Sequence, residues 1–264
     1  RQLNPDVDFS QYDCDNDGYI DNVFVFYAGR GEASGGSSDC VWPHAWEVEV
    51  AEGGTSYIFD NVHLNRYACS NEWEFSSLGY GYRPVGIGTF VHEFSHIMGL
   101  PDLYSTQYVE ETFTPGEWSA MDYGPYNNDG CTPPQYSIFE RSALGYMNPP
   151  ELEGSGNIAL NTIDQGDGYI ISTDDPDEYF LIENRQQNGW DTYISGHGML
   201  VWHVDYDSQI WASNQVNNDP KHNHVDIIEA DGIQDEDSRG GDCFPGDSAV
   251  TALSGSTVPA LVAW

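Results

Sequence analysis

The stretch VHEFSHIMGLPD, residues 91–102, decides how the rest of the chain is interpreted. On a helix, residues four apart project from one face, so His92 and His96 stand side by side and can bind one metal ion. Glu93 lies about a quarter turn from His92, within reach of a water on that metal without being a ligand itself. The apolar residues of the stretch occupy the opposite face, which is typical of a helix that packs on a core and turns its polar edge to a cleft.

The residues after this helix predict a sharp turn. Gly99 can adopt the left-handed conformation that ends a helix, and Pro101 cannot continue one. The turn can bring Asp102 back toward the two imidazoles. Two neutral nitrogens and one carboxylate oxygen leave the fourth position of a tetrahedral zinc ion open, as in catalytic rather than structural sites. Two histidines on an amphipathic helix can also be ordinary hydrogen-bonding residues, but the spacing and the third carboxylate favour the metal site.

The composition limits the classes of partner. The chain has 264 residues and a formal net charge of −35, from 43 acidic and 8 basic residues. Nucleic acid and anionic membrane surfaces would repel such a protein. No apolar run reaches the roughly 18 residues that indicate a membrane-spanning helix. The excess of carboxylates suits an exported protein in a calcium-containing medium, and we expect that protein to be a monomer.

The five cysteines do not form a C-x-x-C pair. A cysteine-based zinc site is therefore not expected. Two disulfides and one free thiol would be compatible with an oxidising compartment, but no pairing follows from the sequence.

The segment DCDNDGYID, residues 13–21, predicts a calcium loop. Such a loop needs oxygen ligands at alternating positions and a glycine for the tight bend. An EF-hand would have a glutamate at its twelfth position, where this chain has Phe24, so the loop is of another kind. The alternative is a solvated turn that leads into a strand. The expected calcium ligands are Asp13, Asp15, Asp17 and Asp21.

Apolar patterns predict the other elements of the first part of the chain. A strand buried on both faces is expected over residues 20–27, and a strand or hairpin through Ile58 and Val62. Residues 66–88 lack a regular pattern, and Thr89 is expected to cap the metal-binding helix. His44, between two tryptophans, could lie near the metal site, but a structural role fits it better.

The second part of the chain predicts one helix followed by strands. Two prolines precede an apolar stripe over residues 136–146, which indicates a helix. Short apolar segments then alternate with Asp, Asn and Gly turns, which is typical of β structure. The strands are expected over residues 169–172, 179–183, 198–204 and 225–230.

Two motifs together resemble the metzincin metallopeptidases. They are HEFSHIMGLPDLY at 92–104 and WSAMDYG at 118–124, which match the extended zinc helix and the methionine-containing turn of those enzymes. Within the metzincins, the chain is most similar to the immune inhibitor A family of secreted bacterial peptidases. The calcium-loop segment also fits that family, as do WPH at 42–44, YFLIENR at 179–185 and WHVD at 202–205.

The resemblance implies an α+β, metzincin-like zinc peptidase with a mixed sheet and an active-site helix, followed by a β-rich C-terminal half. Residues 1–148 would form the catalytic region, with the active-site helix at 89–99 and the Met-turn near Met121. Residues 149–264 would either complete that region or form a small β-sandwich. Only about 20 residues precede the first expected strand, so either the upper sheet is reduced or the natural polypeptide begins earlier.

The resemblance also implies a function: a secreted or cell-surface bacterial endopeptidase that binds zinc at the helix motif, binds calcium in its acidic loop, and acts on proteins or peptides. Glu93 would be the general base and then the general acid. Met121 would form a hydrophobic base beneath the imidazoles. Tyr123 would approach the zinc or the oxyanion, although a core or rim tyrosine is an equal alternative.

Three alternatives stay open. The usual third ligand of metzincins is a histidine, where this chain has Asp102, and Glu117 is a rival ligand. Gly99 favours Asp102, because its turn has a purpose only if the chain passes under the metal.

A calcium-stabilised β-rich binding or adhesion module with an inactive protease remnant is a different class of function, although the intact H-E-x-x-H disfavours it. Hydrolysis of a substrate other than protein is the third alternative.

Overall fold

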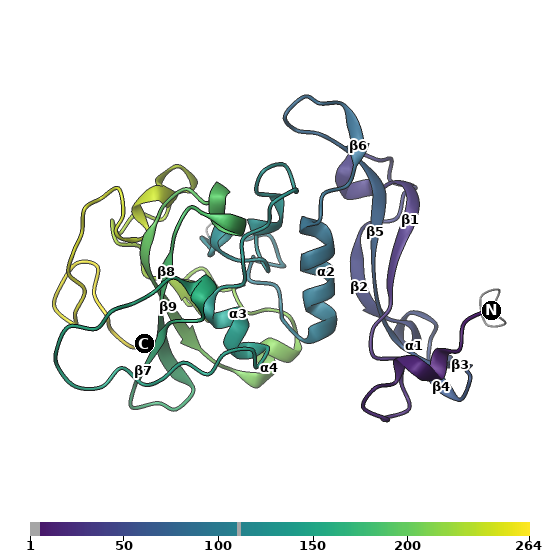
Figure 1. The fold of residues 1–264 in the computed structure, drawn as a ribbon, viewed down its shortest axis with the longest axis horizontal. Helices are drawn as coiled ribbons and strands as arrows, with labels where there is room; N and C mark the ends of the chain where they lie inside the picture. The colour runs from purple at the N-terminus through teal and green to yellow at the C-terminus, as the bar shows by residue number, and fades with distance from the viewer. Residues whose placement is uncertain (1–5, 110–111) are drawn as a thin grey trace. The chain divides into compact units, whose positions relative to one another are not determined.

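The computed structural model describes residues 6–109 and 112–264 of the chain. The chain divides into two compact units, Arg1–Gly99 and Leu100–Trp264 (Figure 1). Both units contain helices and strands, so the mixed α+β class predicted from the sequence is confirmed. Among the described helices, none has the length and the apolar character needed to span a bilayer.

The first unit is built on a four-stranded sheet. Its strands follow the order β1-β5-β2, with β6 paired to β5. β1 is parallel to β5, and β2 and β6 are antiparallel to it. The elements of this unit are β1 (Phe24–Arg30), β2 (His44–Glu47), α1 (Val48–Ala51), β3 (Tyr57–Phe59), β4 (Val62–Leu64), β5 (Arg66–Phe75), β6 (Tyr82–Pro84) and α2 (Gly88–Met98).

The central strand β5 corrects one prediction. Residues 66–88 were expected to be irregular, yet ten of them form the longest strand of the sheet. The middle of β5 carries polar residues that are fully buried, Ser70 and Asn71. A strand with a polar buried centre lacks the apolar pattern from which strands are predicted. The hairpin expected through Ile58 and Val62 is confirmed as β3 and β4.

The first strand is less buried than predicted. β1 begins at Phe24 rather than at residue 20, and Val25 and Phe26 are 46% and 58% exposed. Within the described residues β1 pairs with β5 alone, which makes β1 the end strand of its sheet. The expectation of burial on both faces was therefore wrong. Phe24 contacts Phe90 of α2, with 4.6 Å between the ring centroids.

Helix α2 is the predicted metal-binding helix. It spans Gly88–Met98 and ends at Gly99, which has the left-handed φ of +109° expected for its cap. Thr89 was predicted as the N-cap, but it lies inside the helix; Ile87 is the N-cap residue and makes no side-chain capping bond. The helix contacts β5 and β2 of the same unit, and Figure 1 shows it beside these strands.

The second unit contains an antiparallel sheet of five strands. Their order is β10-β9-β8-β7, with β11 paired to β9. All the strands expected after residue 149 are confirmed, with ends that differ by a few residues. The elements are α3 (Ile138–Ala143), β7 (Tyr169–Ser172), β8 (Glu178–Arg185), β9 (Gly198–Asp205), α4 (Ser208–Ala212), β10 (Val225–Ile227) and β11 (Phe244–Pro245).

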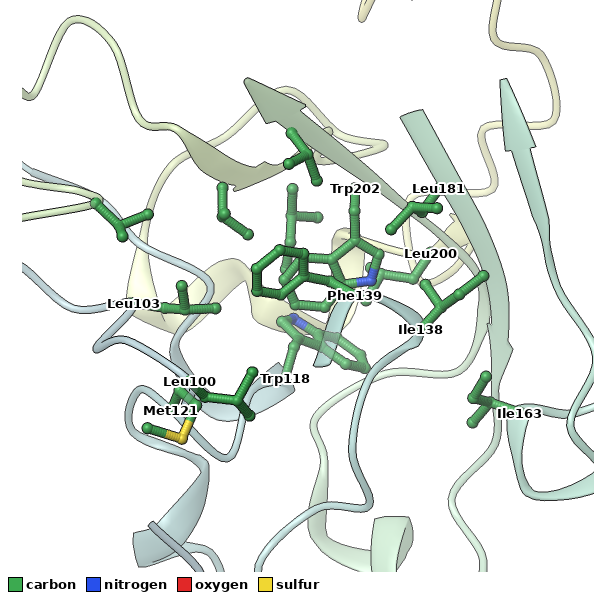
Figure 2. Packing of buried hydrophobic residues seen from close by; sticks show 14 of the residues in the cluster. Leu100, Leu103, Trp118, Met121, Ile138, Phe139, Ile163, Leu181, Leu200 and Trp202 are labelled. Atoms are coloured by element: carbon green, nitrogen blue, oxygen red, sulfur yellow. The ribbon is translucent and has the colours of Figure 1, made fainter. Parts of the chain in front are cut away.

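Helix α3 is shorter than the predicted span 136–146. Its start is fixed by a capping box, in which Ser137 and Glu140 each bond the backbone N–H of the other. α3 packs into the hydrophobic core of the second unit through Ile138 and Phe139. Figure 2 shows Trp118 and Trp202 in the middle of this core, which joins the segment after residue 100 to strands β8 and β9.

All five cysteines are free thiols in the structure. The two disulfides considered compatible with the sequence are therefore not formed. Cys69 and Cys243 are buried, and the other three lie at partly or fully exposed positions.

Candidate metal centre

His92 and His96 lie one turn apart on α2 and present the same ring nitrogen to each other. Their Nε2 atoms are 3.2 Å apart, and their rings are inclined by 82°. Two ligands at about 2.0–2.1 Å from a tetrahedral zinc ion are separated by roughly 3.3 Å. The spacing of the two nitrogens therefore fits a shared zinc ion without rearrangement of the helix.

Asp102 supplies the third donor atom of this group. One donor atom from each of His92, His96 and Asp102 lies within 4.8 Å of the others. The Asp102 side chain is buried, with 5% of its surface exposed. A buried carboxylate grouped with two imidazoles is the donor set of a catalytic zinc site, in which nitrogen and oxygen ligands leave one position open.

Asn214 fixes the position of Asp102. The Asn214 side-chain amide donates to Asp102 Oδ2 at 2.6 Å, and its Oδ1 accepts from the Asp102 backbone N–H at 2.7 Å. Hydrogen-bonding partners behind a metal ligand hold the ligand in its binding orientation. The sequence analysis missed Asn214, which lies 112 residues from Asp102 and belongs to no recognisable motif.

Glu93 follows His92 on the same helix and is 8% exposed. Its charge acts on two groups of the sheet beneath α2. Burial raises the pKa of Tyr27 to about 12, and burial also raises the pKa of Cys69; the negative charge of Glu93 adds to both shifts. Glu93 is therefore within electrostatic range of Tyr27 of β1 and Cys69 of β5.

The methionine turn is bonded to the segment that carries Asp102. The Met121 carbonyl accepts from the backbone N–H of Leu103, next to Asp102, at 2.8 Å. The Met121 N–H donates to Ser119 Oγ and to Glu140 Oε1. Met121 itself is fully buried. Tyr123, in contrast, is 58% exposed and lies 6.2 Å from the ring of Tyr126.

Glu117, the rival third ligand, has other partners. Its Oε2 accepts from the Ser195 hydroxyl at 2.9 Å, and its Oε1 accepts from the Ser195 backbone N–H. Burial raises the pKa of Glu117. Within the described residues, Glu117 belongs to none of the histidine and carboxylate groups that can hold a metal ion. Asp102, in contrast, belongs to such a group together with His92 and His96.

A buried network of ion pairs is bonded to the start of the methionine turn at Trp118. Arg185 of β8 makes two bonds of 2.7 Å to the carboxylate of Asp191 and one of 3.2 Å to Glu183. The same guanidinium donates to the carbonyl of Trp118 at 3.1 Å. Glu183 also accepts from the Trp202 indole at 2.8 Å. This network gives Glu183 and Arg185 of the 179–185 motif a structural role.

The acidic loop brings together three of its four expected ligands. Asp13, Asp15 and Asp21 form a group of carboxylates whose donor atoms lie within 4.8 Å of one another. Asp17 is not in that group; its Oδ1 accepts from the Tyr19 backbone N–H at 2.8 Å.

His44 has the structural surroundings that the sequence favoured. Its Nδ1 lies 2.7 Å from the Trp42 carbonyl, and its Nε2 lies 2.9 Å from the Tyr67 hydroxyl. Both ring nitrogens are therefore engaged within the first unit.

Comparison with known proteins places this chain in a family. The family described as immune inhibitor A peptidase M6, catalytic domain, matches residues 3–144. The pre-pro-metalloprotease PrtV of Vibrio cholerae is 26% identical over 160 residues, which cover 53% of this chain and 17% of that protein. Immune inhibitor A of Bacillus thuringiensis is 29% identical over 145 residues, which cover 49% of this chain and 20% of that protein.

The chain thus spans only about a fifth of the length of these relatives. The family match itself extends over more than half of the chain and includes His92, Glu93, His96, Asp102 and Met121. The chain belongs to the immune inhibitor A family of M6 peptidases.

Proposed function

We propose that this chain is a zinc-dependent endopeptidase that hydrolyses peptide bonds in protein substrates. The observation that carries the proposal is the 3.2 Å separation of the His92 and His96 Nε2 atoms, with Asp102 as the third donor. These three residues would hold the ion and leave one position for water or substrate. When bound, zinc lowers the pKa of water to about 7 and polarises the carbonyl group that is attacked.

Glu93 is the proposed general base and acid. A carboxylate beside the first histidine of the motif can reach the attacking water without binding the metal. Glu93 accepts a proton from that water and then passes the proton to the departing amine. Its burial supports this role, because a carboxylate shielded from bulk water exchanges its proton with the substrate rather than with solvent.

Met121 and Tyr123 have different supporting roles in this proposal. Met121 forms the apolar floor of a metzincin-like site, and its buried position and its bond to Leu103 support that role. Tyr123 has an exposed phenol, which is available to donate a hydrogen bond to the oxyanion of a bound substrate.

The β-rich part of the chain is proposed to complete the peptidase rather than to form a separate module. Asn214 lies in residues 149–264, yet it bonds Asp102 twice. Asn217 of the same segment donates to the Leu103 carbonyl at 2.8 Å. A catalytic region that ended at residue 148 would lack both contacts.

Two further expectations become proposals. The loop of Asp13, Asp15 and Asp21 is proposed to bind calcium, with Asp17 as a ligand that turns inward when the ion binds; the three grouped carboxylates support this. The protein is proposed to act outside the bacterial cell, which its net charge of −35 supports.

The test of the proposed function is the Glu93→Gln variant. We expect it to bind zinc as the unmodified chain does and to lose peptidase activity on casein by at least about 100-fold, the scale of general acid–base catalysis. Glu52→Gln, on an exposed glutamate of the same unit, is the matched control and should keep full activity. Full activity in zinc-loaded Glu93→Gln would remove Glu93 from the mechanism.

A further inference from the structure

A second cluster of metal-binding residue types lies in the second unit. Asp205, His222 and His224 each offer a donor atom, and these atoms lie within 4.8 Å of one another. None of the three belongs to the H-E-x-x-H segment or to the acidic loop. All three are partly buried, with side-chain exposures of 26%, 34% and 16%.

The sheet places two of these residues opposite each other. Asp205 ends β9, and His224 directly precedes β10, which pairs with β9 in antiparallel register from Val204 and Val225 onward. The Asp205 backbone N–H donates to the His224 carbonyl at 2.9 Å. His222 joins them from the adjoining loop, with its Nε2 at 2.6 Å from Asp205 Oδ2. Backbone pairing at the end of β9 and the start of β10 therefore holds Asp205 and His224 in place.

The hydrogen bonds define which nitrogens can bind a cation. His224 Nδ1 lies 2.7 Å from the Asp205 backbone carbonyl, which can only accept, so Nδ1 carries a proton and Nε2 keeps its lone pair. His222 Nε2 donates to the Asp205 carboxylate. A cation can take the place of that proton and bind both His222 Nε2 and the Asp205 carboxylate, while the displaced proton moves through solvent to Nδ1 of His222, so that the ring stays neutral.

Aromatic rings hold the two imidazoles in place. His222 and His224 are stacked, with centroids 4.7 Å apart and planes inclined by 21°. Trp264 stacks on the other side of His222 at 4.3 Å, and the ring of Trp211 meets His224 edge-on at 6.1 Å. Rings held in this way lose little conformational freedom when a metal binds.

We propose that Asp205, His222 and His224 form a second metal site, for zinc or a similar divalent transition-metal ion. Two imidazoles and one carboxylate suit such ions, whereas calcium and magnesium prefer oxygen ligands alone. The bound ion would join the end of β9 to the loop before β10. The segment between β9 and β10 contains α4 and also carries Asn214, so the ion would stabilise the segment that orients Asp102. This consequence, unlike the binding itself, rests on the proposed function.

The test compares the zinc content of matched variants of the full chain. Each protein is equilibrated with buffered free zinc, and zinc per chain is measured by mass spectrometry of the metal. The double variant His222→Asn and His224→Asn should contain about one zinc ion fewer per chain than the unmodified protein. His197→Asn, on an exposed histidine of the same unit, should lose none. Equal zinc contents in the double variant and this control would overturn the proposal.

Two further variants separate this site from the others. The double variant His92→Ala and His96→Ala lacks the proposed catalytic ligands. Replacing His222 and His224 in this variant as well should remove about one further zinc ion per chain. Asp205→Asn keeps the shape of the Asp205 side chain and should weaken zinc binding by at least about 10-fold, because a neutral amide replaces the carboxylate. If neither change alters zinc binding, the cluster is a hydrogen-bonded support of the sheet and the proposal fails.

Discussion

Replacement of Asn214 is predicted to weaken zinc binding although Asn214 does not touch the metal. The side chain makes two short hydrogen bonds to Asp102, one of them to the carboxylate. Asp102 is 5% exposed, so water cannot readily take the place of the lost partner. Loss of such a supporting residue typically lowers metal affinity by about 10- to 100-fold, which corresponds to roughly 1.4–2.7 kcal/mol.

The assay is competition for zinc with a chromophoric chelator. Asn214 has a left-handed φ of +54°, so Asn214→Gly is the cleaner substitution, because alanine would add backbone strain. Asn214→Asp should be worse still, since it places a second carboxylate against Asp102. The control is Asn218→Ala, which loses bonds to Ser105 and Thr106 in the same segment but none to Asp102. A zinc dissociation constant in Asn214→Gly equal to that of the control would refute the role of Asn214.

Two remaining predictions concern stability. Arg185→Met leaves the fully buried carboxylates of Glu183 and Asp191 without their cation, which should cost about 3–5 kcal/mol of unfolding free energy and lower Tm by about 10 °C. The control Arg66→Met, at an exposed ion pair, should change Tm little. Equal Tm shifts in the two variants would argue against a stabilising role for the buried network. Burial raises the pKa of Glu229 to about 8 in the native state. Between the ordinary pKa of a glutamate in the unfolded chain and pH 8, the native state therefore keeps a proton that the unfolded state has lost. The free energy of unfolding falls as pH rises through this range. Glu229→Gln should therefore show a smaller fall in Tm between pH 5 and pH 9 than both the unmodified protein and the exposed Glu236→Gln; an identical fall would show that Glu229 ionises normally in the native state.

The helix of the metal centre was predictable because its signal is local. The spacing of His92 and His96 and the left-handed position of Gly99 both follow from helix geometry, and the structure has the helix within one residue of its predicted ends. Short strands separated by Asp, Asn and Gly turns were equally visible in the second unit. The capping box of Ser137 and Glu140 was present in the sequence and could have set the start of α3.

The missed features depend on contacts that are distant in sequence. β5 was overlooked because its buried centre is polar. Ser70 and Asn71 are buried by parts of the chain that are not adjacent in sequence, so the local pattern does not indicate a buried strand. β1 was expected to be buried on both faces because its apolar run does not reveal its position at the end of the sheet. Asn214 had no signal at all, since nothing near it in the sequence indicates that it meets Asp102.

The most direct test of the metal centre is an anomalous difference map at the zinc absorption edge from crystals of the full chain grown with zinc. We expect a peak bound by Nε2 of His92, Nε2 of His96 and a carboxylate oxygen of Asp102, at about 2.0–2.2 Å from each. A peak with Glu117 in the place of Asp102, or no peak between the two histidines, would contradict the proposed site.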